Sequence, residues 1–209
     1  MKQMMRPNQI FTLLTKIRIV CMRTDYLVKS FLLINLFFAG QVIGMGEAPK
    51  LTLYEACFSG HKSAVDWYIN SDCNLNLFDR DGDTAMHCAI LGGYHKIVKR
   101  LIRSNRVDIN LFQVKREECF AKNALMLAVE SSNTKILKLL VRSHIQLDKP
   151  DFSGITALSY ASTVGNAEKK VKILLRAGAN PKLSDNEGAT AFHHACARGK
   201  LDAVKYLSS

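Results

Sequence analysis

Apolar residues recur at spacings of three and four in five segments between residues 61 and 209, which is the pattern of amphipathic helices. A shorter apolar segment precedes each stripe and is separated from it by a glycine or another small residue. The chain therefore predicts a series of paired short helices, and one such pair is too small to bury its apolar face alone. The stripes are Ala64, Val65, Tyr68 and Ile69; Ile97, Val98, Leu101 and Ile102; Ile136, Leu137, Leu139 and Leu140; Val171, Ile173, Leu174 and Leu175; Leu201, Val204 and Leu207.

The segments that precede these stripes share one frame. Three copies read DRDGDTAMHCAILGG from Asp79, DFSGITALSYASTVG from Asp151 and DNEGATAFHHACARG from Asp185. Two degenerate copies, LTLYEACFSG and NALMLAVESS, fit the same frame from Leu51 and from Asn123. The threonine position falls at residues 51, 84, 123, 156 and 190, so the separations are 33, 39, 33 and 34 residues. This period predicts stacked repeats with a continuous core.

The D-x-x-G-x-T segments are predicted turns that lead into the first helix of each pair. Their glycines allow left-handed backbone, and the threonine hydroxyl is suited to cap the helix that follows. The first copy lacks this turn, which suits a terminal repeat. The 39-residue interval places a projecting loop at residues 111–122, and the fourth copy has one extra residue near residues 166–172.

The frame resembles the ankyrin repeat, whose signature is T-P-L-H-x-A with a period of 33 residues. The histidine of the signature is present as His87 and His193, and alanine replaces the proline in four copies, with Thr52 in the first. The resemblance covers residues 47–209 and implies an all-α solenoid of helix-turn-helix units with turn or β-finger loops. It gives repeats at about 48–78, 79–112, 113–150, 151–184 and 185–209. It also implies that Thr84, His87, Thr156, Thr190 and His193 brace the turns.

The resemblance further implies a monomeric, non-catalytic protein that binds a partner protein through its turn tips and the concave face of its first helices. The residues that the resemblance places at the turn tips include Arg80, Asp83 and Phe152. The first-helix positions include Cys88, Leu127, Tyr160, His194 and Arg198. Aromatic and arginine side chains dominate interface energy, so Arg80, Phe152, Tyr160 and Arg198 are the expected hot spots. Lys115 and Arg116 in the long loop are a second candidate contact.

Two histidine and cysteine pairs are candidates for chemistry. His87 and Cys88 are adjacent, but adjacent residues of a helix point about 100° apart, so they do not face one another. His193 and Cys196 are three apart, which suits two metal ligands, yet the sequence offers no further ligand nearby. The six cysteines are irregularly spaced, which favours reduced and buried thiols. The usual catalytic and nucleotide-binding motifs are missing from the sequence, so we expect no enzyme, metal or cofactor.

Residues 1–46 stand apart from the repeats. Residues 31–46, FLLINLFFAGQVIGMG, follow Lys29 and are short for a membrane span, which takes about 20 residues. They fit the apolar part of an export signal cleaved after Gly46. The alternatives are an uncleaved membrane anchor, a packed N-terminal helix, or a true start at Met22 that makes the first 21 residues a mis-assigned start. If the whole N-terminal segment is mis-assigned, the expected location is the cytoplasm.

Positive charge is the compositional anomaly, with a net charge of +11 on 209 residues. The first 50 residues contribute seven basic and two acidic side chains. Many of the others are on the second helices, at Lys96, Lys99, Arg100 and Arg103; Lys135, Lys138 and Arg142; Lys169, Lys170, Lys172 and Arg176. They are expected on the solvent side as a hydrated face or as a surface for an acidic membrane or partner. Aromatic residues do not interleave with them, which disfavours nucleic acid.

Overall fold

The computed structural model describes residues 48–114 and 121–208. The chain divides into two units, Met1–Pro49 and Lys50–Ser209, and the elements below belong to the second. Its helices are α3 (Leu53–Ser59), α4 (Lys62–Asn70), α5 (Ala85–Leu91), α6 (His95–Arg103), α7 (Ala124–Glu130), α8 (Thr134–Leu140), α9 (Ala157–Ala161), α10 (Ala167–Arg176), α11 (Ala191–Ala197) and α12 (Leu201–Leu207). In the described residues, β-structure is limited to two isolated bridges, so the prediction of an all-α fold is confirmed.

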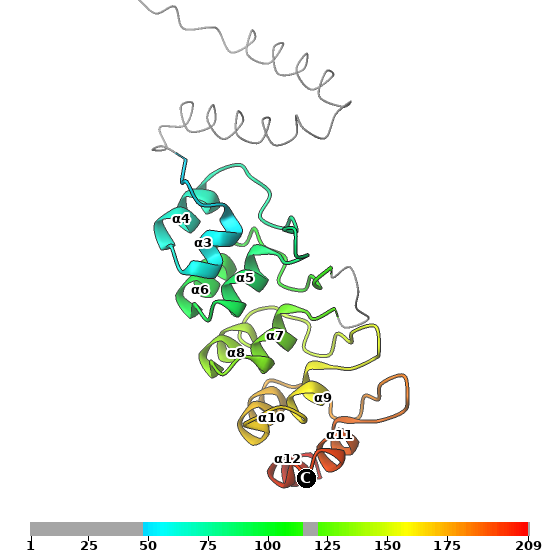
Figure 1. Ribbon diagram of the computed structural model, residues 1–209. Helices are drawn as coiled ribbons and strands as arrows, with labels where there is room; N and C mark the ends of the chain where they lie inside the picture. Colours follow the sequence, from blue (N-terminus) through cyan, green and yellow to red (C-terminus); the bar gives the residue numbers. More distant parts are fainter. Residues whose placement is uncertain (1–47, 115–120, 209) are drawn as a thin grey trace, which may run out of the picture. The chain divides into compact units, whose positions relative to one another are not determined.

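The helices form two layers, as Figure 1 shows. The odd-numbered first helices, α3 to α11, contact one another in sequence order, and the even-numbered second helices, α4 to α12, do the same. The turns extend on the side of the first helices, away from the second helices (Figure 1). Contacts between neighbouring copies therefore build the core, as expected of a repeat array.

One alanine of each copy lies at the centre of this packing. Ala56, Ala89, Ala128, Ala161 and Ala195 are all fully buried. Each sits three residues after an apolar position of the repeat frame, and a larger side chain there would hold adjacent first helices apart. The alanine of the sequence motif is thus a close-packing position.

The turns are held by the aspartate that begins each motif. The Oδ1 atom of Asp79 accepts the N–H groups of Asp81 and Asp83 at 2.9 and 2.8 Å. Asp151 and Asp185 make the same pair of bonds two and four residues ahead, at 2.9 to 3.0 Å. Gly82, Gly154 and Gly188 adopt the left-handed backbone that was predicted. The aspartate is a further brace that the sequence motif contained without its role being recognised.

The cap of the first copy and the burial of Lys170 differ from the prediction. The first helix of the first copy is capped by Thr52 and not at Leu51, because Glu55 completes a capping box with Thr52. In the fourth copy, the extra residue is accommodated before α10, where Asn166 is left-handed. Lys170 was predicted on the solvent side, but it is 3% exposed. The inserted residue moves it to the core position of Ile97 and Ile136.

Candidate protein-binding surface

His87 holds the start of α5 to the turn before it. Its Nδ1 accepts the N–H of Thr84 at 3.2 Å, and its Nε2 lies 3.1 Å from the carbonyl oxygen of Leu111. Since Nδ1 is an acceptor, the proton is on Nε2 and is donated to Leu111. The Thr84 hydroxyl in turn accepts the N–H of His87 at 3.4 Å. The ring is 1% exposed, and its bonds join the start of α5 to the beginning of the loop at residues 111–122.

Cys88 points elsewhere and is buried, which corrects its assignment to an accessible first-helix position. Its thiol donates to Asp79 Oδ2 at 3.6 Å. Burial raises the pKa of this thiol, and the negative charges of Asp79 and Asp83 raise it further. A thiol held in the neutral form is a poor nucleophile, so the arrangement does not support a reactive His87–Cys88 pair. Leu127, predicted at the equivalent position, is buried as well.

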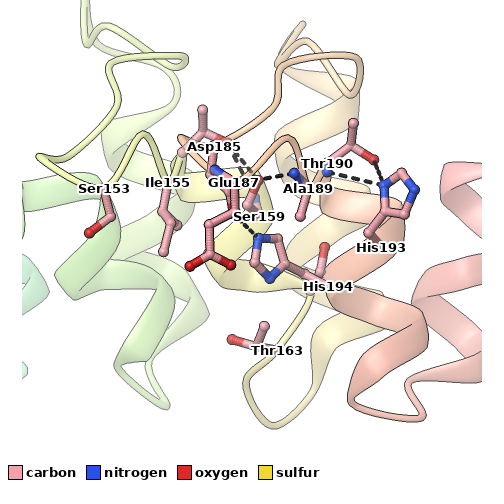
Figure 2. Close-up of polar contacts among 12 residues, drawn as sticks. Ser153, Ile155, Ser159, Thr163, Asp185, Glu187, Ala189, Thr190, His193 and His194 are labelled. Carbon is pink, nitrogen blue, oxygen red and sulfur yellow. Dashed lines mark hydrogen bonds and ion pairs between the residues drawn. The ribbon is translucent and has the colours of Figure 1, made fainter.

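The adjacent histidines His193 and His194 make separate contacts (Figure 2). His193 Nδ1 accepts the N–H of Thr190 at 3.2 Å and lies 2.9 Å from the Thr190 hydroxyl. His194 turns the other way, and its Nε2 lies 2.8 Å from Asp185 Oδ2. Cys196 is exposed, in contrast to the buried position predicted for it. In the described part of the chain, groups of three or more His, Cys, Asp or Glu that could hold a metal are absent.

Of the four free cysteines described, Cys57 and Cys88 are buried, Cys73 is partly exposed and Cys196 is exposed. Burial raises the pKa of Cys57 to about 12. The expectation of buried thiols therefore holds for Cys57 and Cys88 and fails for Cys73 and Cys196.

The predicted tip residues divide into exposed and buried ones. Arg80 is exposed, and Phe152 is 76% exposed at the end of its turn. Asp83 was also predicted at a tip, but it is buried because the side-chain amide of Gln113 donates to its carboxylate. Its Oδ1 also lies 3.8 Å from His87 Nδ1. Asp83 therefore ties its turn to the next loop, and its carboxylate faces this chain's own residues.

Tyr160 lies in a polar cluster between the third and fourth copies. Its hydroxyl donates to Glu130 Oε1 at 3.4 Å, and the Lys122 ammonium lies 4.9 Å from the centre of its ring. Lys122 also pairs with Glu130 Oε2 at 2.9 Å. These contacts hold the partly exposed Tyr160 side chain on α9.

The last copy presents a salt-bridged histidine beside an exposed arginine. His194 is partly exposed, and Arg198, one turn further along the chain, is exposed. Burial raises the pKa of Asp185, but bonds from the Ala189 N–H, His194 and the Glu187 N–H outweigh it and hold the pKa below its usual value. The carboxylate is therefore ionised near neutral pH and orients the His194 ring.

Three exposed apolar side chains on α3, on α5 and in the α5–α6 connection were not predicted from the sequence. Phe58 is 57% exposed, Leu91 48% and Tyr94 40%. The Tyr94 ring packs against Gly60 and Gly92, where an added Cβ would lie 2.5 and 2.9 Å from ring atoms. Phe58 and Leu91 each precede a loop glycine by two residues, at Gly60 and Gly93. That shared spacing is the sequence feature that reveals them.

Some predicted positions fall outside the described residues. These are Lys115 and Arg116 of the long loop, and residues 1–46 with their candidate export signal. Across the part of the chain that the structure describes, we find no helix with the length and apolar character to cross a membrane.

Comparison with known proteins agrees with this geometry. A family model described as ankyrin repeats (3 copies) matches residues 27–113, 53–151, 108–185 and 125–209. The chain is 27% identical to the nuclear factor NF-kappa-B p105 subunit of Gallus gallus, covering 73% of this chain and 16% of that protein. It is 25% identical to Rabankyrin-5 of Homo sapiens, covering 79% of this chain and 15% of that protein.

A third relative is the transient receptor potential cation channel subfamily A member 1 homolog of Caenorhabditis elegans, with 26% identity over 77% of this chain and 13% of that protein. The chain thus spans less than a fifth of the length of these relatives. The matched ranges, the stacked helix pairs and the braced turns agree with one another, and the chain belongs to the ankyrin repeat family.

Proposed function

We propose that this array is a non-catalytic module that binds a partner protein through its binding face, by which we mean the turns and the exposed residues of the first helices. Ankyrin repeats are in general protein-interaction modules, and the proposal extends that general property to a particular surface. Arg80, Phe152, Tyr160 and Arg198 are its proposed contacts, with His194 beside them.

The distribution of exposed apolar side chains carries the proposal. Among the described residues, the exposed large hydrophobic side chains are Phe58, Leu77, Phe78, Leu91, Tyr94, Val114, Phe152, Phe192 and Leu201. All except Leu201 lie on first helices, in the loops before them or in the α5–α6 connection. The exposed residues of α6, α8 and α10 are instead rich in lysine and arginine. Exposed apolar area favours protein association once it is removed from water.

The contacts that hold Tyr160 and His194 support the same surface. Tyr160 and His194 are oriented by Glu130 and Asp185, so their rotamers are largely fixed before a partner arrives. Binding then loses less conformational entropy at these positions, which favours affinity.

Site-specific photo-crosslinking tests this proposal and identifies the partner. A photoreactive phenylalanine analogue is placed at Phe152, and in a matched variant at Lys138 on the second-helix side. The proposal expects a protein to be captured from Phe152 and not from Lys138 in the cells that make the chain. Capture from Lys138 alone would contradict it.

The export signal proposed for residues 31–46 rests on sequence, and the mature N-terminus tests it. A mature N-terminus at residues 45–47 supports export. A start at Met1 in a membrane fraction supports an anchor, and a start at Met22 supports a shorter natural chain.

A further inference from the structure

Side chains of the second helices α4 and α6 line an open hollow of about 540 Å³. Its lining is unusually rich in cations, and it consists of Lys62, Asp66, Ile69, Lys96, Lys99, Arg100, Arg103 and Ser104. The hollow thus gathers five basic side chains around one carboxylate.

The one carboxylate in the hollow is already engaged. Asp66 forms an ion pair with Arg100 across the two helices. Among the described residues, no carboxylate lies within 4.0 Å of the charged groups of Lys62, Lys96, Lys99 or Arg103. Four further basic residues therefore line the hollow with no carboxylate at ion-pair distance, while Arg100 is paired with Asp66.

A second hollow of similar kind, between α10 and α12, gives the contrast. Its charged lining is Glu168, Lys169, Lys200 and Asp202, which balances two basic against two acidic side chains. The excess of positive charge is thus a property of the α4–α6 hollow and not of every gap between second helices.

From this placement we propose that the α4–α6 hollow binds a ligand with two or more adjacent phosphate groups. A phosphate brings close to two negative charges and three acceptor oxygens into a small volume. Arginine and lysine supply the matching donors, and several phosphates are needed to neutralise four cations in one place. An acidic peptide carries one charge per side chain and spreads these charges along about 3.3 Å of chain per residue, so it fits the compact hollow less well. This site is independent of the binding face.

Calorimetric titration with inositol hexakisphosphate tests the site on the full chain. One variant carries Lys96→Gln, Lys99→Gln and Arg103→Gln in the hollow. Its matched control carries Lys135→Gln, Lys138→Gln and Arg142→Gln, which removes three charges from α8 and the turn after it, outside the hollow. We expect the first variant to bind at least about tenfold more weakly than wild type and the control to change by less than about threefold.

Several results would overturn the proposal. They are no binding by wild type, an equal loss in both variants, or equal affinity for a hexaglutamate peptide, which would make the ligand an acidic segment. Since the variants leave the binding face intact, they are also expected to retain the crosslinked partner, so the two proposals fail separately.

Vesicles distinguish a lipid headgroup from a soluble phosphate. Sedimentation with vesicles containing phosphatidylinositol 4,5-bisphosphate, lost in the hollow variant, identifies a headgroup, whereas binding to the soluble probe alone identifies a soluble ligand. Residues 31–46 are common to all variants, so their own affinity for lipid cancels in the comparison. Equal binding of wild type to vesicles containing only phosphatidylserine as the acidic lipid would contradict a requirement for clustered phosphates.

Discussion

Lys170 occupies in the fourth repeat the core position that Ile136 occupies in the third, and both side chains are buried. Burial lowers the pKa of Lys170 because it disfavours the charged ammonium, and the nearby Glu130 carboxylate opposes this only in part. The fourth repeat therefore contains a charged group where its neighbours have hydrocarbon.

Replacing this lysine is expected to stabilise the fold. Lys170→Met keeps the length of the side chain and removes the cost of burying the charge, so the free energy of unfolding should rise by about 1–3 kcal/mol. Lys169→Met is the control, because Lys169 is exposed and should change stability little. Urea unfolding at neutral pH measures both, and a loss of stability in Lys170→Met would show that the ammonium is favourable where it lies.

The same substitution has a predicted pH dependence. A lysine whose pKa is lowered in the folded state is still charged at neutral pH, so the free-energy cost of burying its charge is present there. Between the lowered pKa and the ordinary one, the folded state binds fewer protons than the unfolded state. The cost is relieved as pH rises toward and past the ordinary value of 10.5. The stability gained in Lys170→Met over wild type should therefore shrink as pH rises through this range. A gain that stays constant or grows would contradict the account of burial.

Gly82 is predicted to be the least replaceable turn glycine. Its φ is +76°, and an added Cβ would lie 1.6 Å from the carbonyl oxygen of Val114 in the next loop. Gly188 has a similar φ of +82° with nothing within 4 Å of an added Cβ, so it is a matched control. Gly188→Ala should cost about 1–2 kcal/mol for backbone conformation alone. Gly82→Ala should cost at least about 2 kcal/mol more, because the adjoining loop must move. Equal costs in thermal unfolding would show that the close approach contributes nothing.

His87 and His193 are expected to contribute unequally to stability. Each ring accepts the N–H of its threonine, but His87 is buried and bonds Leu111 as well, whereas His193 is exposed. His87→Ala should lower the free energy of unfolding by about 1–3 kcal/mol, since it leaves buried polar groups without a partner. His193→Ala should cost less than about 1 kcal/mol, because water can replace its bonds. Guanidinium unfolding checks this, and the turn-brace role also requires that His87→Ala keep its affinity for the partner.

The four thiols of the described residues should react with a maleimide in the order of their exposure. Cys196 is expected to be modified first and Cys73 next, while Cys57 and Cys88 should stay protected until the array unfolds. The raised pKa of both buried thiols adds to this protection because the thiolate is the reactive form. Mass mapping of labelled peptides reads each site separately. Labelling of native Cys88 as fast as Cys196 would contradict the position described for it.

The repeat architecture could be predicted from the sequence because each copy has the same local pattern of turn, cap and close-packing residues. Thr84, the glycine before it and the alanine after it carry information that is confined to about ten residues, and repetition makes it reliable. The caps, the left-handed turns and the order of helices follow from such local patterns.

The errors arose where a side chain's environment depends on a neighbouring repeat. Asp83 is buried by Gln113, which lies thirty residues away, and no local pattern announces that contact. Lys170 was assigned to the solvent side, but the inserted residue shifts the register of α10 by one position and brings Lys170 into the core. Cys88 and Leu127 were assigned to an accessible surface by position in the motif, although their exposure depends on what packs beside them.

The affinity of the purified partner, once crosslinking has identified it, measures whether the turns and first helices form the binding surface. Calorimetry would compare wild type with Phe152→Ala, Tyr160→Ala and Arg198→Ala, and with Lys138→Ala on the second-helix side as the control, each checked for native circular dichroism. At least one binding-face variant should weaken the complex by about tenfold or more, while Lys138→Ala should leave it unchanged. Unchanged affinity in all three, or a loss confined to Lys138→Ala, would contradict binding through the turns and first helices.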